Sequence, residues 1–232
     1  MRLILLLLLF SSGAIGQQLT GTQLLDKAIA YHDPQGNWES FIGNLTVTMS
    51  TPNKPDRESH LRIDLPSELF QITMNKDGDQ IQQAFIKDSC QYMINGVESI
   101  TAADLRKHKI TCDRTKLWRN YYTYLYGLPM KLKDSGTNID PVVQEKEFKG
   151  KTYKVLKATY DAGVGKDTWY FYFDPETYAM EIYQFFKVEA NNDGEYILLT
   201  GEEIISGIKM PKTRAWYYNK ADKYLGTDEL SK

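Results

Sequence analysis

The sequence predicts an α+β protein in which antiparallel strands predominate and helices are confined to two places. Apolar and polar residues alternate with a period of two through most of the chain, which is typical of half-buried strands. Helical spacing of apolar residues occurs only near residue 25 and between residues 100 and 127. No repeat and no linker rich in Pro, Gly or Ser divides the chain, so we expect residues 17–232 to form a single domain.

The first residues have the composition of a secretory signal peptide. Arg2 precedes the apolar run LILLLLLF, which is followed by the small residues SSGAIG. This pattern predicts a signal peptide over residues 1–16, with cleavage after Gly16. The apolar run is too short to cross a bilayer, because a spanning helix needs roughly 20 apolar residues. We therefore expect an exported protein, periplasmic or extracellular, that is soluble after cleavage and has no transmembrane segment.

The first helix is predicted over residues 22–32, TQLLDKAIAYH. Thr20 and Gln23 have the spacing of a capping box, in which each side chain bonds the backbone of the other residue. One apolar stripe is formed by Leu24, Leu25, Ala28 and Ile29. The turn sequence DPQGN follows and ends the helix.

Alternating strands follow this helix. In residues 41–50, Leu45 and Val47 lie on one face and threonines on the other. The same alternation recurs in residues 60–66 and 68–75, and residues 81–96 are typical of a further pair of strands.

The periodicity becomes helical in the middle of the chain. Residues 100–109 begin with Thr101 and Asp104 at capping-box spacing, and residues 114–127 form a longer predicted helix that ends at Gly127. Its predicted shared face consists of Leu117, Tyr121, Tyr124 and Leu125. After a polar loop at 133–138, strands are predicted in residues 151–160, 169–186, 195–200 and 210–218.

The most unusual stretch is the aromatic hairpin WYFYFDPETYAMEIYQFF, residues 169–186, which turns at DPET. Strand alternation places Trp169, Phe171 and Phe173 on one face, which we expect to point inward. The same alternation places Tyr170 and Tyr172 on the other face, where their hydroxyl groups are expected to reach water. After the turn, Met180 and Ile182 are expected to continue the apolar face, and Glu181 and Tyr183 the more polar one.

Cys90 and Cys112 are the only cysteines. In an exported protein an even pair is most simply a disulfide, which would stabilise the fold by roughly 3 kcal/mol in the chain-entropy model. A redox-active or metal-binding pair is the alternative, but it usually needs the close CxxC spacing. The formal net charge of −2 and the scattered basic residues argue against nucleic acid as a partner.

Catalytic motifs are missing from the sequence. His32, His60 and His108 have no cysteine, histidine or carboxylate at recognised metal-ligand spacing. There is no GxSxG elbow, HExxH motif, Walker loop or GxGxxG motif. We therefore expect a protein that is not an enzyme, with no catalytic residue, no metal and no cofactor.

Four motifs carry a resemblance to a known group of proteins: LLDKAIAYHDPQGNWESF, NYYTYLYGLPMKLKD, TWYFYFDPETYAMEIYQFF and SGIKMPKTRAWYYNKADKYLGT. Through them residues 17–232 resemble a family of uncharacterised exported bacterial proteins. That family is related to the outer-membrane lipoprotein-sorting fold of the periplasmic lipoprotein carrier and its outer-membrane receptor.

The resemblance implies a strongly curved antiparallel sheet, an incomplete β-barrel, with helices covering its concave face. In the carriers, the space between sheet and helices is an apolar cavity for acyl chains, and a characteristic arginine ties the lid closed. No arginine of this sequence is assigned to that role. The residues expected to line the corresponding cavity are Leu45, Val47, Leu61, Ile63, Phe70, Ile72, Trp169, Phe171, Met180 and Ile182.

Two classes of function are compatible with these expectations. The first is a non-catalytic protein of the cell envelope that binds or carries a lipid, a lipoprotein acyl chain or another apolar ligand. The second is a structural or interaction module whose interior is filled by its own side chains and whose tyrosine-rich surface contacts an envelope protein.

Overall fold

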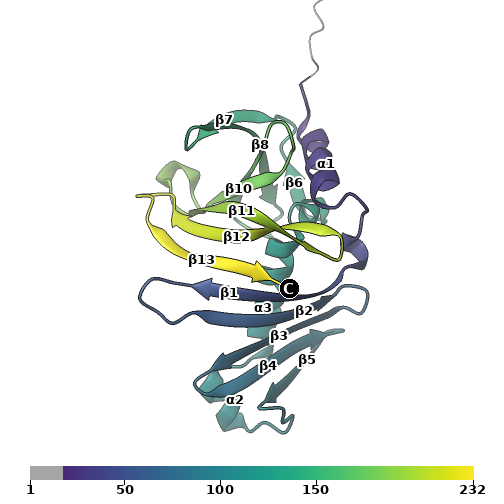
Figure 1. Ribbon diagram of the computed structural model, residues 1–232, viewed down its shortest axis with the longest axis vertical. Helices are drawn as coiled ribbons and strands as arrows, with labels where there is room; N and C mark the ends of the chain where they lie inside the picture. Colours follow the sequence, from purple (N-terminus) through teal and green to yellow (C-terminus); the bar gives the residue numbers. More distant parts are fainter. Residues whose placement is uncertain (1–17) are drawn as a thin grey trace, which may run out of the picture.

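The computed structural model describes residues 18–232, so the predicted signal peptide lies outside the described residues. Within this range, thirteen strands form one antiparallel sheet that stays open, and the helices pack on it (Figure 1). Within residues 18–232, none of the helices combines the length and apolar character needed to cross a membrane. The predicted α+β class and the open antiparallel sheet are confirmed.

The helices are α1 (Gly21–His32), α2 (Ala102–His108) and α3 (Cys112–Gly127), and three short 3-10 turns span Trp38–Ser40, Met130–Lys133 and Glu189–Asn191. The strands before α2 are β1 (Ile42–Ser50), β2 (Arg57–Asp64), β3 (Leu69–Lys76), β4 (Asp79–Ile86) and β5 (Ser89–Ile94). The strands after α3 are β6 (Thr137–Ile139), β7 (Gln144–Phe148), β8 (Lys151–Tyr160), β9 (Thr168–Phe173), β10 (Met180–Phe186), β11 (Glu195–Ile205), β12 (Ile208–Tyr218) and β13 (Tyr224–Ser231).

The sheet consists of two meanders joined at one seam. Its strand order is β5-β4-β3-β2-β1-β13-β12-β11-β10-β9-β8-β6, and β7 also pairs with β8. The seam is the pairing of β1 with β13. Since β5 lies at one edge and β6 at the other, the segment that contains α2 and α3 has to cross a face of the sheet. In Figure 1, α3 accordingly lies behind the central strands.

Helix α1 forms as predicted and begins one residue earlier than expected. The Thr20 side chain accepts a hydrogen bond from the Gln23 backbone, and the Gln23 side chain accepts one from the Thr20 backbone, which completes the capping box. Leu24, Leu25 and Ala28 are buried against the sheet.

Helix α3 is held at its first residue by the Cys90–Cys112 disulfide, whose Cα atoms are 5.6 Å apart. This bond confirms the predicted pairing and attaches the helix to edge strand β5. The predicted apolar face of α3 is wrong, because Leu117 is 66% exposed and Tyr121 is 37% exposed. The buried face instead consists of Thr115, Tyr122, Leu125 and Tyr126. These residues also have helical spacing, and the aromatic rings among them, which offer more apolar area than Leu117, decide the orientation of the helix.

One face of the sheet, α1 and α3 enclose the main hydrophobic core. Most of the predicted lining residues are buried in it, namely Leu45, Val47, Leu61, Ile63, Phe70, Ile72, Phe171 and Met180. Trp169 is partly buried and packs against the same core, with its ring 4.9 Å from the Phe185 ring and 6.0 Å from the Phe171 ring. The expectation that the apolar rings of the hairpin point inward is confirmed.

The opposite face of the hairpin departs from the prediction. Tyr170 and Tyr172 do not reach water; each is 3% exposed, in a second cluster with Tyr153, Val155 and Ile182. This cluster is covered in part by Phe148, from β7, which curls over the top of the sheet in Figure 1. The sequence of β7 contains only one aromatic residue, so its role as a cover is not visible in the sequence pattern.

The placement of Ile182 with the inward-facing residues was also wrong. The register of β9 and β10 shifts between Met180 and Ile182, which is a β-bulge or irregularity in the ladder. A bulge inserts one extra residue and reverses the face of every residue beyond it. Met180 therefore lies in the main core, Ile182 in the second cluster, and Tyr183 in the main core.

Candidate functional site

A row of polar side chains crosses the otherwise apolar face beneath α3. The strand register pairs Arg57 of β2 with Met49 of β1, Met49 with Asp228 of β13, and Asp228 with Arg214 of β12. Partners in a register lie on the same face of a sheet. The ladder therefore places two guanidinium groups and a carboxylate in one line across the middle of the molecule.

Arg214 is only 1% exposed and connects β12 to the far end of α3. Its Nη2 donates to the Leu125 carbonyl oxygen at 3.3 Å, and its Nη1 donates to the Pro211 carbonyl oxygen at 3.0 Å. The guanidinium carbon also lies 4.1 Å from the centre of the Tyr126 ring, within cation–π range. Together with the disulfide at Cys112, these contacts fix both ends of α3 on the sheet.

Asp228 is the acidic member of the row and is 5% exposed. Burial raises the pKa of its carboxyl group, and the charge of Arg214, a hydrogen bond from Trp216 and the charge of Arg57 act in the opposite direction. Trp216 Nε1 donates to Asp228 Oδ2 at 3.2 Å. Asp228 thus lies between two cations and also orients an aromatic ring.

Beside Asp228, an apolar hollow of about 270 Å³ opens between α3 and the sheet. Tyr121 of α3 and Trp216 of β12 form its aromatic walls, and their ring centres are 6.4 Å apart. The remaining lining residues are Met49, Glu195, Leu225, Gly226 and Asp228. We name this feature the apolar hollow.

Three buried polar atoms near Arg214 have no hydrogen-bond partner among residues 18–232. They are Arg214 Nε and the hydroxyl groups of Tyr126 and Tyr183. Burial raises the pKa of both phenols, so both remain protonated and able to donate. A buried donor without a partner costs free energy, and such groups often lie where a protein binds a polar group or a water molecule.

The apolar hollow differs from the cavity predicted from the sequence, because none of the ten predicted lining residues lines it. The sequence signal that marks this site is a charged residue at a strand position that faces inward. Arg214 is an even number of residues from the core residue Met210 and from Trp216, so strand alternation places it on their face. Asp228 is likewise two residues from the core residue Leu230.

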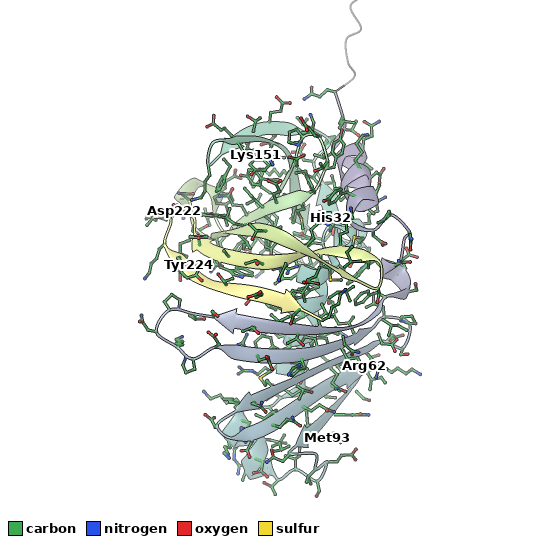
Figure 2. All side chains as sticks on the ribbon, viewed as in Figure 1. His32, Arg62, Met93, Lys151, Asp222 and Tyr224 are labelled. Carbon is green, nitrogen blue, oxygen red and sulfur yellow. A yellow bond between two sulfur atoms is a disulfide. The ribbon has the colours of Figure 1, made fainter. Side chains whose placement is uncertain are left out.

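His32 lines a separate surface hollow of about 410 Å³, together with Tyr31, Glu181 and Glu202. Its Nδ1 lies 2.7 Å from the Lys209 carbonyl oxygen, and the Met180 backbone N–H donates to its Nε2 at 2.9 Å. These partners require a neutral ring with the proton on Nδ1. Both nitrogens are therefore engaged by the backbone, and the ring joins α1 to β10 and β12; Figure 2 shows it below α1.

Because burial lowers the pKa of His32, the fold is expected to lose stability as the pH falls below about 6.5, the ordinary pKa of histidine. Below that pH the unfolded chain binds a proton that the folded chain does not, so acid favours unfolding until the folded-state pKa is reached. Urea unfolding of wild type and His32→Gln at about pH 7.5 and about pH 5.5 checks this expectation. The variant should show the smaller loss; equal losses in the two proteins would show that His32 does not contribute.

The other two histidines make different contacts. His60 lies on the exposed side of β2, where its Nε2 is 3.0 Å from Glu58 Oε1. The side chain of His108 is 1% exposed, and its Nε2 is 3.1 Å from Asp79 Oδ2. Across residues 18–232, no group of three or more His, Cys, Asp or Glu side chains has an arrangement that could hold a metal ion.

Comparisons with solved structures relate this arrangement to a known fold. A LolA superfamily protein from Nitrosomonas europaea superposes with a TM-score of 0.51 at 13% identity, over 92% of this chain and 92% of that chain. An outer-membrane lipoprotein-sorting protein domain from Vibrio parahaemolyticus gives 0.46 at 9% identity, over 90% and 88%. A DUF1329 family protein from Desulfovibrio piger gives 0.46 at 10% identity, over 92% of both chains.

The likeness to the Nitrosomonas protein shows that the chain has a LolA-like fold. The model of DUF6503, a family of unknown function, matches residues 1–231. No curated protein matches the sequence.

Proposed function

Since the chain belongs to the DUF6503 family, whose function is unknown, we propose from its structure that it is a non-catalytic protein of the cell envelope that binds an apolar ligand. The ligand is a lipid, a lipoprotein acyl chain or a similar apolar chain, and it lies between α3 and the central strands. The apolar hollow beside Tyr121 and Trp216 is the observation that carries this proposal.

The hollow has the physical properties that an apolar chain requires. Its walls are mainly aromatic and aliphatic, and burial of apolar surface there contributes about 25 cal/mol per Å² removed from water. Its volume is just below the range of about 300–1,000 Å³ that is usual for small-molecule sites. Tyr121 is 37% exposed, so the hollow is open to solvent at its helical wall, where an apolar chain can enter.

The proposed location is the periplasm or the outside of the cell. Support comes from the composition of residues 1–16 and from the Cys90–Cys112 disulfide, which is stable in oxidising compartments. A non-catalytic role agrees with the histidines, because the ring nitrogens of His32 both bond the backbone.

The second candidate function is an envelope interaction module. It is favoured by the tyrosines on the face of the sheet opposite to α3, where Tyr217 stacks on the buried Tyr196 at 5.0 Å and Tyr224 is 39% exposed. Lys149 and Asp222 surround these rings, and Figure 2 shows Asp222 and Tyr224 at the same side of the molecule. Tyrosine is enriched at protein interfaces, so such a surface suits a protein partner.

The proposed function is tested with a fluorescent fatty acid and with lipid extraction. Wild-type protein is expected to bind the probe, and mass spectrometry of lipids extracted from the purified native protein should detect a bound apolar molecule. Leu225→Trp fills the apolar hollow and should greatly weaken probe binding while leaving the fold intact, since the hollow has room for a larger side chain. The matched control is Ile204→Trp on β11, which adds the same ring at a position that is 54% exposed.

If wild-type protein binds neither the probe nor an extractable lipid, ligand binding is wrong and the interaction module takes its place. If Leu225→Trp and Ile204→Trp bind the probe as well as wild type does, the ligand lies elsewhere than in the apolar hollow.

A further inference from the structure

A second hollow, of about 470 Å³, lies next to the apolar hollow and has a different character. It is bounded by strands β2, β3 and β4 on one side and by α2 and α3 on the other. Its charged and aromatic lining residues include Asp56, Arg57, Glu58, Lys76, Arg114 and Trp118. We name this feature the basic hollow, because Arg57, Lys76 and Arg114 outnumber its two acids.

Two guanidinium groups of the basic hollow lie over one indole ring. The guanidinium carbon of Arg57 is 5.3 Å from the centre of the Trp118 ring, and that of Arg114 is 6.0 Å from it. Neither group forms an ion pair with any residue from 18 to 232. Arg57 is partly buried, and Arg114 is exposed beside it. A partly buried arginine usually has a carboxylate or phosphate partner, so Arg57 has unused capacity for an anion, to which Arg114 adds a second charge.

Two buried nitrogen atoms are also available to a ligand. Arg57 Nε and His108 Nδ1 are buried and have no hydrogen-bond partner within the described chain. His108 is 5% exposed, and Asp79 at its Nε2 leaves Nδ1 as the free position of the ring. Unpaired buried polar atoms are rare in native proteins, and a ligand oxyanion would give Arg57 Nε an acceptor. Because His108 Nε2 donates to the Asp79 carboxylate, Nδ1 of the neutral ring is an acceptor and suits a hydroxyl group of the ligand.

The nearby carboxylates do not supply that anion. Asp228 lies in the same row as Arg57 and is affected by its charge, but within residues 18–232 the two groups form no ion pair. Glu58 Oε1 is 3.0 Å from His60 Nε2 on the outer side of β2. Asp79 Oδ2 is 2.7 Å from Lys107 Nζ, which is a separate contact at the beginning of β4. Asp56 lines the basic hollow and lies in the exposed loop before β2, outside ion-pair distance of both arginines.

The basic hollow and the apolar hollow share a boundary. Arg57 Nη2 of the first lies 3.1 Å from Met49 Sδ of the second. On α3, Trp118 of the first and Tyr121 of the second are one turn apart, with ring centres at 6.2 Å. A molecule that lies along this side of α3 therefore meets cations at one end and an apolar surface at the other.

We propose that the ligand is an anionic amphiphile whose oxyanion head group binds in the basic hollow, between Arg57 and Arg114, while its chain occupies the apolar hollow. This inference rests on the proposed function and narrows its ligand class. A carboxylate or a phosphate has the charge and the geometry that a guanidinium fork binds through two parallel hydrogen bonds. The shared chemistry is an oxyanion, so a fatty acid and a single-chain phospholipid both qualify.

Calorimetric titrations of the full-length protein test the proposal with three probes whose alkyl chains are equally long: dodecanoate, dodecyl phosphate and dodecanol. Inorganic phosphate alone is the fourth ligand titrated. Wild type is expected to bind the two anionic probes at least about tenfold more tightly than dodecanol, a difference of about 1.4 kcal/mol. Arg114→Gln and Arg57→Gln should each remove most of that preference without changing the affinity for dodecanol. Arg114 is exposed, so Arg114→Gln keeps the test valid if Arg57→Gln fails to fold.

The matched control is Arg62→Gln, which removes the same charge from β2 but at an exposed position, where Arg62 Nη2 lies 3.9 Å from Asp64 Oδ2; Arg62 is labelled in Figure 2. It should bind every probe as wild type does.

Equal affinity of wild type for dodecanol and dodecanoate would overturn the head-group site and leave the proposed function in place. Binding of inorganic phosphate as tightly as dodecyl phosphate would show a free-anion site and overturn the amphiphile. Failure of all three chain probes would overturn both proposals.

Discussion

Replacing Arg214 by methionine is expected to lower the free energy of unfolding by about 3–5 kcal/mol. The substitution keeps a long side chain in place but removes the bonds to the Leu125 and Pro211 carbonyl oxygens. It also leaves the Asp228 carboxylate buried without the opposing charge that affects it most. Removing one member of a buried charged arrangement costs more than the arrangement contributes, because the remaining charge stays uncompensated. Denaturant unfolding followed by circular dichroism measures the change.

The second substitution Asp228→Asn, made in the Arg214→Met protein, should recover part of the loss because it removes the orphaned charge. Arg62→Met on the exposed side of β2 is the control and should change stability by no more than about 0.5 kcal/mol. A loss below about 1 kcal/mol for Arg214→Met would mean that water replaces the guanidinium, and that Arg214 does not hold α3 on the sheet.

Phe171→Ala is expected to lower the free energy of unfolding by about 3–5 kcal/mol, since a fully buried ring is lost and a void remains. Phe171 is 0% exposed, and its ring stacks on that of Trp169 in the main core. Phe171→Trp should also destabilise, by about 1–3 kcal/mol, because a larger ring has to displace packed neighbours. Thermal and denaturant unfolding of both variants provide the measurement.

Ile204→Ala, at an exposed position of β11, is the control for loss of apolar volume and should be close to neutral. If Phe171→Trp is as stable as wild type, the interior next to the aromatic hairpin accommodates extra volume. The predicted lining residues around Phe171 would then border a cavity in solution, and the acyl-chain site would extend from the apolar hollow into the present core.

Much of the fold could be predicted from the sequence because alternation and helical spacing are local properties. The capping residues of α1 and α2, most of the strands and the inward faces of Leu45, Ile63 and Phe171 followed from them. The predictions were wrong where a distant segment or a single backbone irregularity decides whether a side chain is buried or which face it lies on. β7 covers Tyr172, and the bulge after Met180 reverses the face of Ile182.

The candidate site was less predictable because it depends on strand register. Met49 and Arg57 are close in sequence, but Asp228 and Arg214 reach them only through the pairings of β1 with β13 and of β13 with β12. A single sequence contains no measure of such long-range register. Strand alternation places the charged residues Arg214 and Asp228 on the inward face, which is unusual, but it does not show that the two residues are close in space.

The seam between β1 and β13 has a consequence for the route by which the chain folds. It pairs residues such as Val47 and Leu230, which lie near opposite ends of the described chain, whereas the other neighbouring strands are close in sequence. Local hairpins form quickly. Contacts between distant segments form slowly, because closing the loop between them costs entropy before the contact contributes any stabilising free energy. We expect the two meanders to form first and the seam to close last. Until it closes, β1 presents an unpaired edge at which a second unfinished chain can add a strand, so aggregation competes with folding most strongly at this step.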